Sequence, residues 1–503
     1  MSKQSLRSSS FDYLRTAGLK HFWIFAVILI SIFVLRLPSL FEPFWYGDEG
    51  IFAAVARNLN FGGTLYLTAW DNKPPMIYLT YAGIFKAFGV SMFGLRLVAL
   101  VVVLITATII YEIAQKVMGI KRALWAMAIF GALTSLRMIE GNLALTEIFM
   151  ILPISLAMFI AIWRKFDYLS IFGAGFLFAI ASLYKQVGAL EAVALGLFLF
   201  LYLKSFRGFF KKGFVLAVGF AIPYIITIAY FASKNLVSDF IFAAYTYYRI
   251  YLSESPRYAL LINAAKVMPI ACAFFYGFWK KIRGETRVFH LFLLWGAFSF
   301  LGSFFSGRTY GHYLIQATPA LSLLFASLVK TTKIKTAGII LAGYILPIIF
   351  LTVTLFAGFG LSHLVAQASY YKNFLDLLSG VKKVSGYNNY FDSNVNSIMA
   401  TRDFLKAKGA GGKSVYIWGD WAWIYATSDL KNPSRYVTSF HVFGVPGGKE
   451  EVIKSLSKSP PIYIVKPPSS IGNFPEFEKV VGESYTPIIR IDGVQIFERR
   501  SLE

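Results

Sequence analysis

Acidic and basic side chains gather near the N-terminal end of the chain in an order that could support chemistry. Asp48 and Glu49 are adjacent in WYGDEG, directly after the first apolar segment, and DNKPP follows with Asp71 and Lys73. Ionisable groups are costly to keep beside a bilayer, so they are rarely retained there without a role. A carboxylate can take a proton from a hydroxyl, and a lysine can bind a phosphate. These residues therefore predict a site that activates a hydroxyl and binds an anion.

Later loops add further candidates for the same site. Glu140 lies in RMIEGN, Glu147 lies just inside the next apolar segment, and Lys185 lies in SLYKQVG between two apolar segments. The remaining candidates follow between the later segments: Arg249, Arg257, Arg308, His312 and Tyr313. If these loops share one side of a membrane, a few carboxylates converge there with several cations.

The candidate acids and lysines also have purely structural interpretations. Asp48 could be the N-cap of a helix that begins at Gly50, and Glu49 would then interact favourably with the helix dipole. Lys73 precedes two prolines and could lie in a solvated turn. Lys185 ends a predicted helix, so its side chain could extend to the membrane surface. These alternatives stay open until the segments are placed.

The histidine and the arginines have structural alternatives as well. His312 could serve packing or hydrogen bonding, because the five histidines are scattered and lack the usual spacing of a zinc site. Arg249 and Arg257 could anchor a loop to anionic lipid head groups. A shared site is favoured because all of the candidates fall on one predicted face of the membrane, which is deduced from other residues.

The composition is that of an integral membrane protein. Hydrophobic residues make up 57% of the chain, charged residues only 15%, and the mean hydropathy is +0.60. A soluble domain has about a quarter of its residues charged. The net charge of +23 comes from short Lys and Arg clusters between apolar runs. That pattern is typical of cytoplasmic loops and argues against a nucleic-acid partner.

Spans of about 20 residues predict about eleven hydrophobic helices. They are expected at 21–39, 94–115, 122–137, 143–163, 168–184, 187–203, 213–233, 259–279, 288–305, 313–329 and 336–358. Basic residues in alternate loops place the N-terminus in the cytoplasm and the C-terminus outside. No small-residue cleavage site follows the first helix, so a retained anchor is expected. The single Cys272 excludes an intramolecular disulfide, which favours a prokaryotic plasma (inner) membrane.

Two further regions differ from the spans. In the first outer loop, EGIFAAVARNLN and PMIYLTYAGIFKAFG have the periodicity of amphipathic helices on the membrane surface, the second beginning at Pro74-Pro75. After residue 358, KSVYIWG, PIYIVKP and YTPIIRIDGVQIFE predict strands, and KEEVIKSLSK predicts a helix. The chain is therefore expected to divide into a transmembrane catalytic domain, 1–358, and a small extracytoplasmic α/β domain, 359–503. The second would serve as a lid or a partner-docking domain.

A sugar linked by phosphate to a long isoprenoid would use this set of residues. The phosphate is a good leaving group, so the reaction needs no pair of carboxylates as in a glycosidase. It needs one base for the acceptor hydroxyl and cations for the phosphate. Asp48 suits the base; Lys73, Lys185 and Arg308, with Arg249 or Arg257, suit the phosphate. Displacement from the opposite face inverts the anomeric centre.

The segments WYGDEGIFAAVARNLN and DNKPPMIYLTYAGIFKAFGVSMFGLRL resemble the opening of membrane glycosyltransferases with the GT-C fold. The nearest group is the protein O-mannosyltransferase and aminoarabinose-transferase superfamily. The resemblance covers residues 30 to 330. It consists of an ordered series: the D-E pair, K-P-P, R-L at Arg96, and H-Y-L-x-x-x-x-P at 312–319.

The resemblance implies a polytopic α-helical fold with Asp48 as the catalytic base. Lys73 and the cations near Lys185 and Arg308 would contact the lipid phosphate, with help from Tyr313. Glu49 and Asp71 are family-like neighbours whose roles the resemblance does not separate. Members often carry an acid in the second outer loop, and either Glu140 or Glu147 could fill that position. The resemblance implies no metal ion, and no cofactor is expected.

We therefore expect an inverting glycosyltransferase that moves a sugar from a polyprenyl-phosphate donor to an extracytoplasmic hydroxyl of lipid A, a protein or an envelope glycan. Its partners are the lipid-linked donor, membrane lipids and the acceptor, with no nucleic acid. A lipid or sugar transporter or flippase is the alternative. It would place charges or broken helices at the middle of the membrane, where the apolar segments here are nearly free of charge. A non-catalytic scaffold would leave the acids and lysine of the first loop unexplained.

Overall fold

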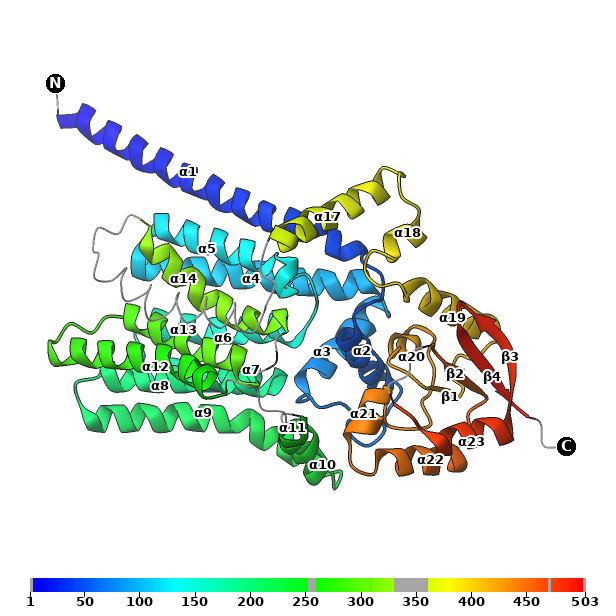
Figure 1. Ribbon diagram of the computed structural model, residues 1–503. Helices are drawn as coiled ribbons and strands as arrows, with labels where there is room; N and C mark the ends of the chain where they lie inside the picture. The colour runs from blue at the N-terminus through cyan, green and yellow to red at the C-terminus, as the bar shows by residue number, and fades with distance from the viewer. Residues whose placement is uncertain are drawn as a thin grey trace.

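A computed structural model describes residues 3–251, 259–306, 308, 310–329, 361–468 and 472–500. The chain forms a bundle of long helices that adjoins a C-terminal α/β part (Figure 1). Short helices from several loops lie where the two meet (Figure 1). Arg257 and the helix expected at 336–358 lie outside the described residues.

The first ten expected apolar segments all form helices. They are α1 Lys3–Arg36, α4 Met92–Met118, α5 Ile120–Thr134, α6 Thr146–Trp163, α7 Tyr168–Tyr184, α8 Leu190–Tyr202, α9 Phe206–Ala232, α12 Ala259–Ile282, α13 Phe289–Phe304 and α14 Thr318–Leu328. Among the described residues, four stretches are long and apolar enough to cross a membrane: Leu19–Phe41, Met92–Met118, Thr146–Trp163 and Phe206–Ala232. The protein is thus a membrane protein of mostly helical fold, while the total of eleven crossings and their orientation stay predictions.

Glycines let two helices of the bundle approach closely. A Cβ atom on Gly175 of α7 would lie 2.2 Å from the carbonyl oxygen of Leu216 on α9. A Cβ atom on Gly219 of α9 would lie 2.1 Å from the carbonyl oxygen of Phe172. Small residues permit such backbone contact where lipid provides no hydrophobic driving force. Substituting either glycine would therefore push α7 and α9 apart.

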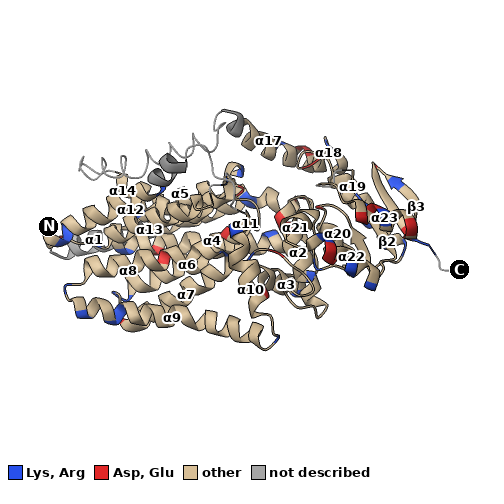
Figure 2. Ribbon diagram, turned by 60° about the horizontal axis from the view of Figure 1, so that its bottom comes forward, with Lys and Arg blue, Asp and Glu red and all other residues tan. Residues whose placement is uncertain are grey.

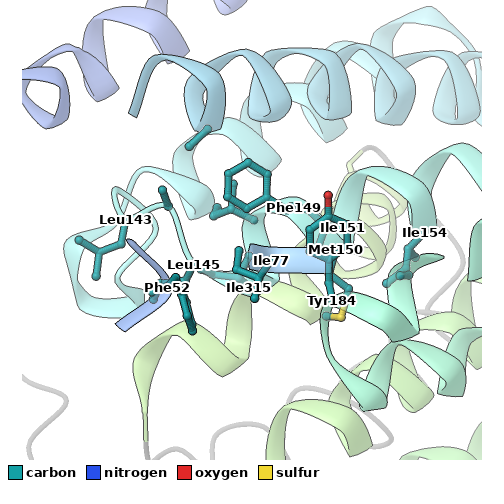
Figure 3. Close-up of a cluster of buried hydrophobic side chains, with 14 of the residues drawn as sticks. Phe52, Ile77, Leu143, Leu145, Phe149, Met150, Ile151, Ile154, Tyr184 and Ile315 are labelled. Atoms are coloured by element: carbon teal, nitrogen blue, oxygen red, sulfur yellow. The ribbon is translucent and has the colours of Figure 1, made fainter. Parts of the chain in front are cut away.

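Apolar side chains fill the bundle up to the junction with the C-terminal part. Figure 3 shows such a cluster, with labelled side chains Phe52, Ile77, Leu143, Leu145, Phe149, Met150, Ile151, Ile154, Tyr184 and Ile315. Charged residues are sparse along the bundle, and Lys and Arg appear at the end farthest from the C-terminal part (Figure 2). This distribution matches the basic loops from which the orientation is predicted.

The two helices expected in the first loop are confirmed as α2 Gly47–Asn60 and α3 Met76–Phe88, with Pro75 at the N-cap of α3. α2 packs against the C-terminal part, because a Cβ atom on Gly50 would lie 2.8 Å from the Trp423 ring. The indole N–H of Trp423 also donates to the Tyr46 carbonyl at 2.9 Å. Other short elements at the junction are η1 Leu37–Phe41, η2 Arg137–Ile139, η3 Gln186–Ala189, α10 Val237–Ile241, η4 Phe242–Thr246, α11 Tyr247–Tyr251 and η5 Gly311–Ala317.

The C-terminal part contains the strands and the helix expected from its alternating pattern. Its strands are β1 Val415–Ile417, β2 Tyr463–Lys466, β3 Tyr485–Ile491 and β4 Val494–Arg499, in the sheet order β1-β2-β4-β3. β1 and β2 are parallel, and the other pairs are antiparallel. Its helices are α17 Leu361–Leu378, α18 Val384–Asn388, α19 Val395–Ala407, α20 Trp423–Thr427, α21 Ser439–Gly444, α22 Gly448–Lys458 and α23 Pro475–Ser484.

Candidate active site

A cavity of about 260 Å³ lies at the junction between the bundle and the C-terminal part. Its polar lining comes from five regions that are far apart in the sequence. Those residues are Tyr46, Asp48, Asp71, Asn72, Lys73, Thr146, Glu147, Lys185, Tyr310, His312, Tyr313, Asp420, Thr438 and His441. The structure thus brings together seven of the site residues predicted from the sequence: Asp48, Asp71, Lys73, Glu147, Lys185, His312 and Tyr313.

Asp48 lies in the first turn of α2 and faces the cavity. The helix begins at Gly47 and its N-cap is Tyr46, so the interpretation of Asp48 as an N-cap is wrong. Within the described part of the chain, its carboxylate makes no hydrogen bond or ion pair. Its charge acts on Lys73 and on Lys185. Asp48 is therefore available to accept a proton from a molecule in the cavity.

Glu49 does not line the cavity. Its carboxylate is fully buried, lies 2.7 Å from the Arg96 guanidinium, and accepts the Ala144 N–H at 2.6 Å. Glu42 lies 3.4 Å from the same guanidinium. Burial raises the pKa of Glu49 against the opposing effect of Arg96. Because neighbouring residues of a helix point in different directions, only Asp48 of the pair reaches the cavity, and Glu49, which was also expected to be catalytic, does not line it.

Lys73 is held at the cavity by its own backbone and by tyrosines. Its carbonyl accepts the Tyr66 hydroxyl at 2.7 Å, and its Nζ donates to Asn72 Oδ1 at 3.2 Å. Its side chain also hydrogen-bonds Tyr248 of α11. Burial lowers the pKa of Lys73, but Tyr248 and the nearby acids outweigh it, so the pKa lies well above that of an ordinary lysine. Lys73 is a fixed cation rather than part of a solvated turn.

Lys185 and Glu147 form an ion pair in the cavity wall. Glu147 also accepts the Thr146 hydroxyl at 2.7 Å, and Lys185 lies over the Tyr313 ring at 3.5 Å. The lysine is therefore pinned between a carboxylate and an aromatic face, and the interpretation that it extends to a membrane surface is wrong. Of the two candidate acids in the second loop, Glu147 is the one that lines the cavity.

Glu140 and His312 pair with each other beside the cavity. Tyr46 donates to the same Glu140 carboxylate at 3.0 Å. His312 lines the cavity, whereas Glu140 does not. The pairing agrees with a hydrogen-bonding role for His312, and it fixes the tyrosine that precedes α2.

Two of the arginine candidates, Arg249 and Arg308, do not line the cavity. Arg308 acts electrostatically on Tyr247, and its backbone N–H donates to Ser306 Oγ at 3.3 Å. Arg249 on α11 is exposed. Neither residue is among those that line the cavity. Their assignment to the phosphate remains a prediction, and Arg257 lies outside the described residues.

A smaller cavity of about 180 Å³, with mostly apolar walls, adjoins the first. Lys185 and Tyr313 belong to both cavities. The other lining residues of the smaller cavity come from η3, η4, α11 and α13 and from the residues just after α13: Gln186, Val187, Ala244, Tyr245, Tyr248, Gly302, Phe305 and Ser306. The smaller, apolar cavity thus meets the larger, polar cavity at Lys185.

Sequence reasoning missed the contribution of the C-terminal part. Asp420, Thr438, Phe440 and His441 all line the cavity. Asp420 accepts the Ser439 hydroxyl at 3.0 Å. These residues stand in a short segment without a known motif, so only the docking of the two parts reveals them. Among the described residues, no group of three His, Cys, Asp or Glu side chains is arranged to hold a metal ion.

Comparisons with known proteins agree with this geometry. A family model described as dolichyl-phosphate-mannose-protein mannosyltransferase matches residues 72–232. Two crystal structures of ArnT from Cupriavidus metallidurans are similar over nearly the whole chain. The one bound to undecaprenyl phosphate has a TM-score of 0.59 at 15% identity and covers 95% of this chain and 98% of ArnT. The apo structure has a TM-score of 0.57 at 14% identity, covering 96% and 98%.

An uncharacterised protein from Aquifex aeolicus (strain VF5) is also similar to this chain. It is 23% identical over 358 residues, which are 67% of this chain and 70% of that protein. The family match and the two ArnT structures together confirm the expected resemblance. The chain shares the fold of ArnT, a GT-C glycosyltransferase, and residues 72–232 match the mannosyltransferase family model.

Proposed function

We propose that the protein is an inverting glycosyltransferase that uses a polyprenyl-phosphate sugar as donor. The observation that carries this proposal is one cavity that combines the carboxylate of Asp48, which has no partner among the described residues, with the cations Lys73 and Lys185. Asp48 would take the proton of the acceptor hydroxyl as that oxygen attacks the anomeric carbon. The bond from this carbon to the phosphate oxygen breaks, and the lysines stabilise the departing polyprenyl phosphate.

The adjoining apolar cavity supports a lipid-linked donor. A phosphate held between Lys73 and Lys185 would lie where the polar and apolar spaces meet, so the first isoprene units could enter the apolar space. The similar ArnT structure binds undecaprenyl phosphate. The acceptor, a hydroxyl of lipid A, a protein or an envelope glycan, would approach Asp48 on the outer side of the membrane.

A transporter or flippase would need charged groups or broken helices at the middle of the bundle. Lys266 is buried in the third turn of α12, whereas the buried charges Arg96, Glu147 and Glu191 lie within the first two turns of α4, α6 and α8. These turns are at the end of the bundle next to the C-terminal part (Figure 1). The placement favours a reaction at the junction over passage through the bundle.

The test is transfer by the purified full-length protein. The protein would be incubated with polyprenyl-phosphate sugars labelled in the sugar, with envelope extracts as acceptor. We expect a labelled product and an equal amount of released polyprenyl phosphate. NMR of the product should show that the anomeric configuration is inverted relative to the donor. Release of free sugar only, or movement of intact donor across liposomes without bond cleavage, would refute the proposal.

A further inference from the structure

The loop that carries Lys73 is fastened to the C-terminal part by its backbone. The Trp70 N–H donates to the Arg435 carbonyl at 2.8 Å, and Trp70 forms a β-bridge with Tyr436. The Arg435 guanidinium donates to the Tyr66 carbonyl at 3.1 Å. The Trp70 ring packs edge-on against the His441 ring, with centroids 5.0 Å apart. The loop and the C-terminal part therefore form one unit beside the cavity.

Buried side chains extend this connection from the C-terminal part to Asp71. Nε2 of His441 on α21 lies 3.3 Å from Asp71 Oδ1, and Thr438 Oγ1 lies 3.1 Å from His441 Nδ1. All three residues are at most 3% exposed. This contact is electrostatic, and a carboxylate oxygen repels a nitrogen lone pair, so Nε2 is the ring nitrogen that carries the proton. Burial lowers the pKa of His441, so the ring is neutral and Nδ1 accepts the Thr438 hydroxyl.

The connection continues from Asp71 to the backbone of Lys73. The Tyr78 hydroxyl donates to Asp71 Oδ2 at 2.7 Å. Its oxygen accepts the Lys73 N–H at 3.2 Å. Because the Tyr78 hydroxyl donates its hydrogen bond to Asp71, the lone pairs of the Tyr78 oxygen are free to accept the backbone N–H of Lys73. Hydrogen bonds thus link Thr438 to His441 and Asp71 to the Lys73 backbone, and the electrostatic contact of His441 with Asp71 joins the two halves of the path.

We propose that Thr438, His441, Asp71 and Tyr78 form a positioning chain through which the C-terminal part fixes Lys73 for the donor phosphate. His441 and Asp71 are positioning residues in this proposal, because they act through Lys73. The inference rests on the proposed function, since it assigns the phosphate to Lys73. It makes the C-terminal part a component of the donor site instead of a separate docking domain.

The test compares substitutions at His441 in the full-length protein. His441→Ala removes the polar contact to the buried Asp71 carboxylate, and we expect the KM for the sugar donor to rise about tenfold. The acceptor KM and kcat should stay within about twofold. In His441→Gln, the side-chain amide can replace the Nε2 donor, so the donor KM should return to within about threefold of the wild type.

A matched control separates positioning from general destabilisation. His290→Gln alters another buried histidine, which contacts the Arg287 backbone outside the cavity. We expect it to lower Tm without changing the donor KM. If His441→Ala fails to fold, Thr438→Val decides, because it removes only the donor to Nδ1 and should still raise the donor KM.

The outcomes distinguish this inference from the proposed function. An unchanged donor KM in the folded His441 or Thr438 variant, with sugar transfer intact in the wild type, would overturn the positioning chain alone. An equal rise of the donor KM in the His290→Gln control would also overturn the positioning chain. Failure of the wild-type protein to use any polyprenyl-phosphate sugar would refute the proposed function itself.

Discussion

Glu49→Gln separates the two members of the acid pair, because the structure gives them different tasks. The Glu49 carboxylate is fully buried against Arg96 at 2.7 Å, and Glu42 lies 3.4 Å from the same guanidinium. Glutamine keeps the shape of the side chain and an acceptor oxygen for the Ala144 N–H. It removes the negative charge that compensates Arg96. The expected loss is therefore one of stability and not of chemistry.

The magnitude follows from the burial of the pair. Removing one partner of a buried ion pair costs about 3–5 kcal/mol. Glu42 remains beside Arg96, and the Asn142 carbonyl still accepts from its guanidinium. These remaining partners place the expected loss near the lower end, at about 3 kcal/mol. In a chain of this size that corresponds to a fall in Tm of about 3 °C.

The assay is thermal unfolding in detergent, followed by tryptophan fluorescence, together with the rate of sugar transfer below Tm. Glu478→Gln is the matched control, because Glu478 pairs with Lys466 at the surface and is about half exposed. Such pairs contribute about 0–1 kcal/mol, so its Tm should barely move. An unchanged Tm in Glu49→Gln, combined with loss of transfer, would refute the structural assignment and return Glu49 to catalysis.

Three further predictions concern the cations and the histidine. Lys73→Ala should raise the donor KM about 10- to 100-fold and leave the acceptor KM unchanged; an unchanged donor KM would place the phosphate elsewhere. Glu147→Gln leaves Lys185 buried without its carboxylate, so undecaprenyl phosphate should raise the Tm of the variant more than that of the wild type; equal shifts would contradict this. Because burial lowers the pKa of His441, its stabilising contribution is complete above about pH 6.5 and is lost as the pH falls through the lowered value. The Tm of the wild type should then fall more steeply below pH 6.5 than that of His441→Gln, and parallel curves would exclude His441 as the cause.

Much of the fold could be predicted because hydropathy depends only on local sequence. Long apolar runs located the first ten helices, and alternating residues located the strands of the C-terminal part. The distribution of charge also predicted that Asp48, Lys73 and Lys185 lie on the same side of the membrane, because basic residues in alternate loops assign each loop to one side. Their arrangement around one cavity agrees with that prediction.

Local sequence gives no guide where the direction of a side chain or the docking of the two parts decides a contact. Asp48 and Glu49 are adjacent, and only helix geometry separates the one that faces the cavity from the one that pairs with Arg96. Arg249 was expected at the phosphate, but its position on α11 leaves it exposed. His441 reaches Asp71 across most of the chain length, a contact that no local pattern encodes.

Single-turnover sugar transfer by Asp48→Asn tests the central claim most directly. Asparagine keeps the size of the side chain but cannot take a proton from the acceptor hydroxyl. We expect the rate of transfer from a labelled polyprenyl-phosphate sugar to fall about 100- to 10,000-fold. Membrane insertion, Tm and binding of undecaprenyl phosphate should be unchanged. Transfer by the folded variant at the wild-type rate would contradict the assignment of Asp48 as the base.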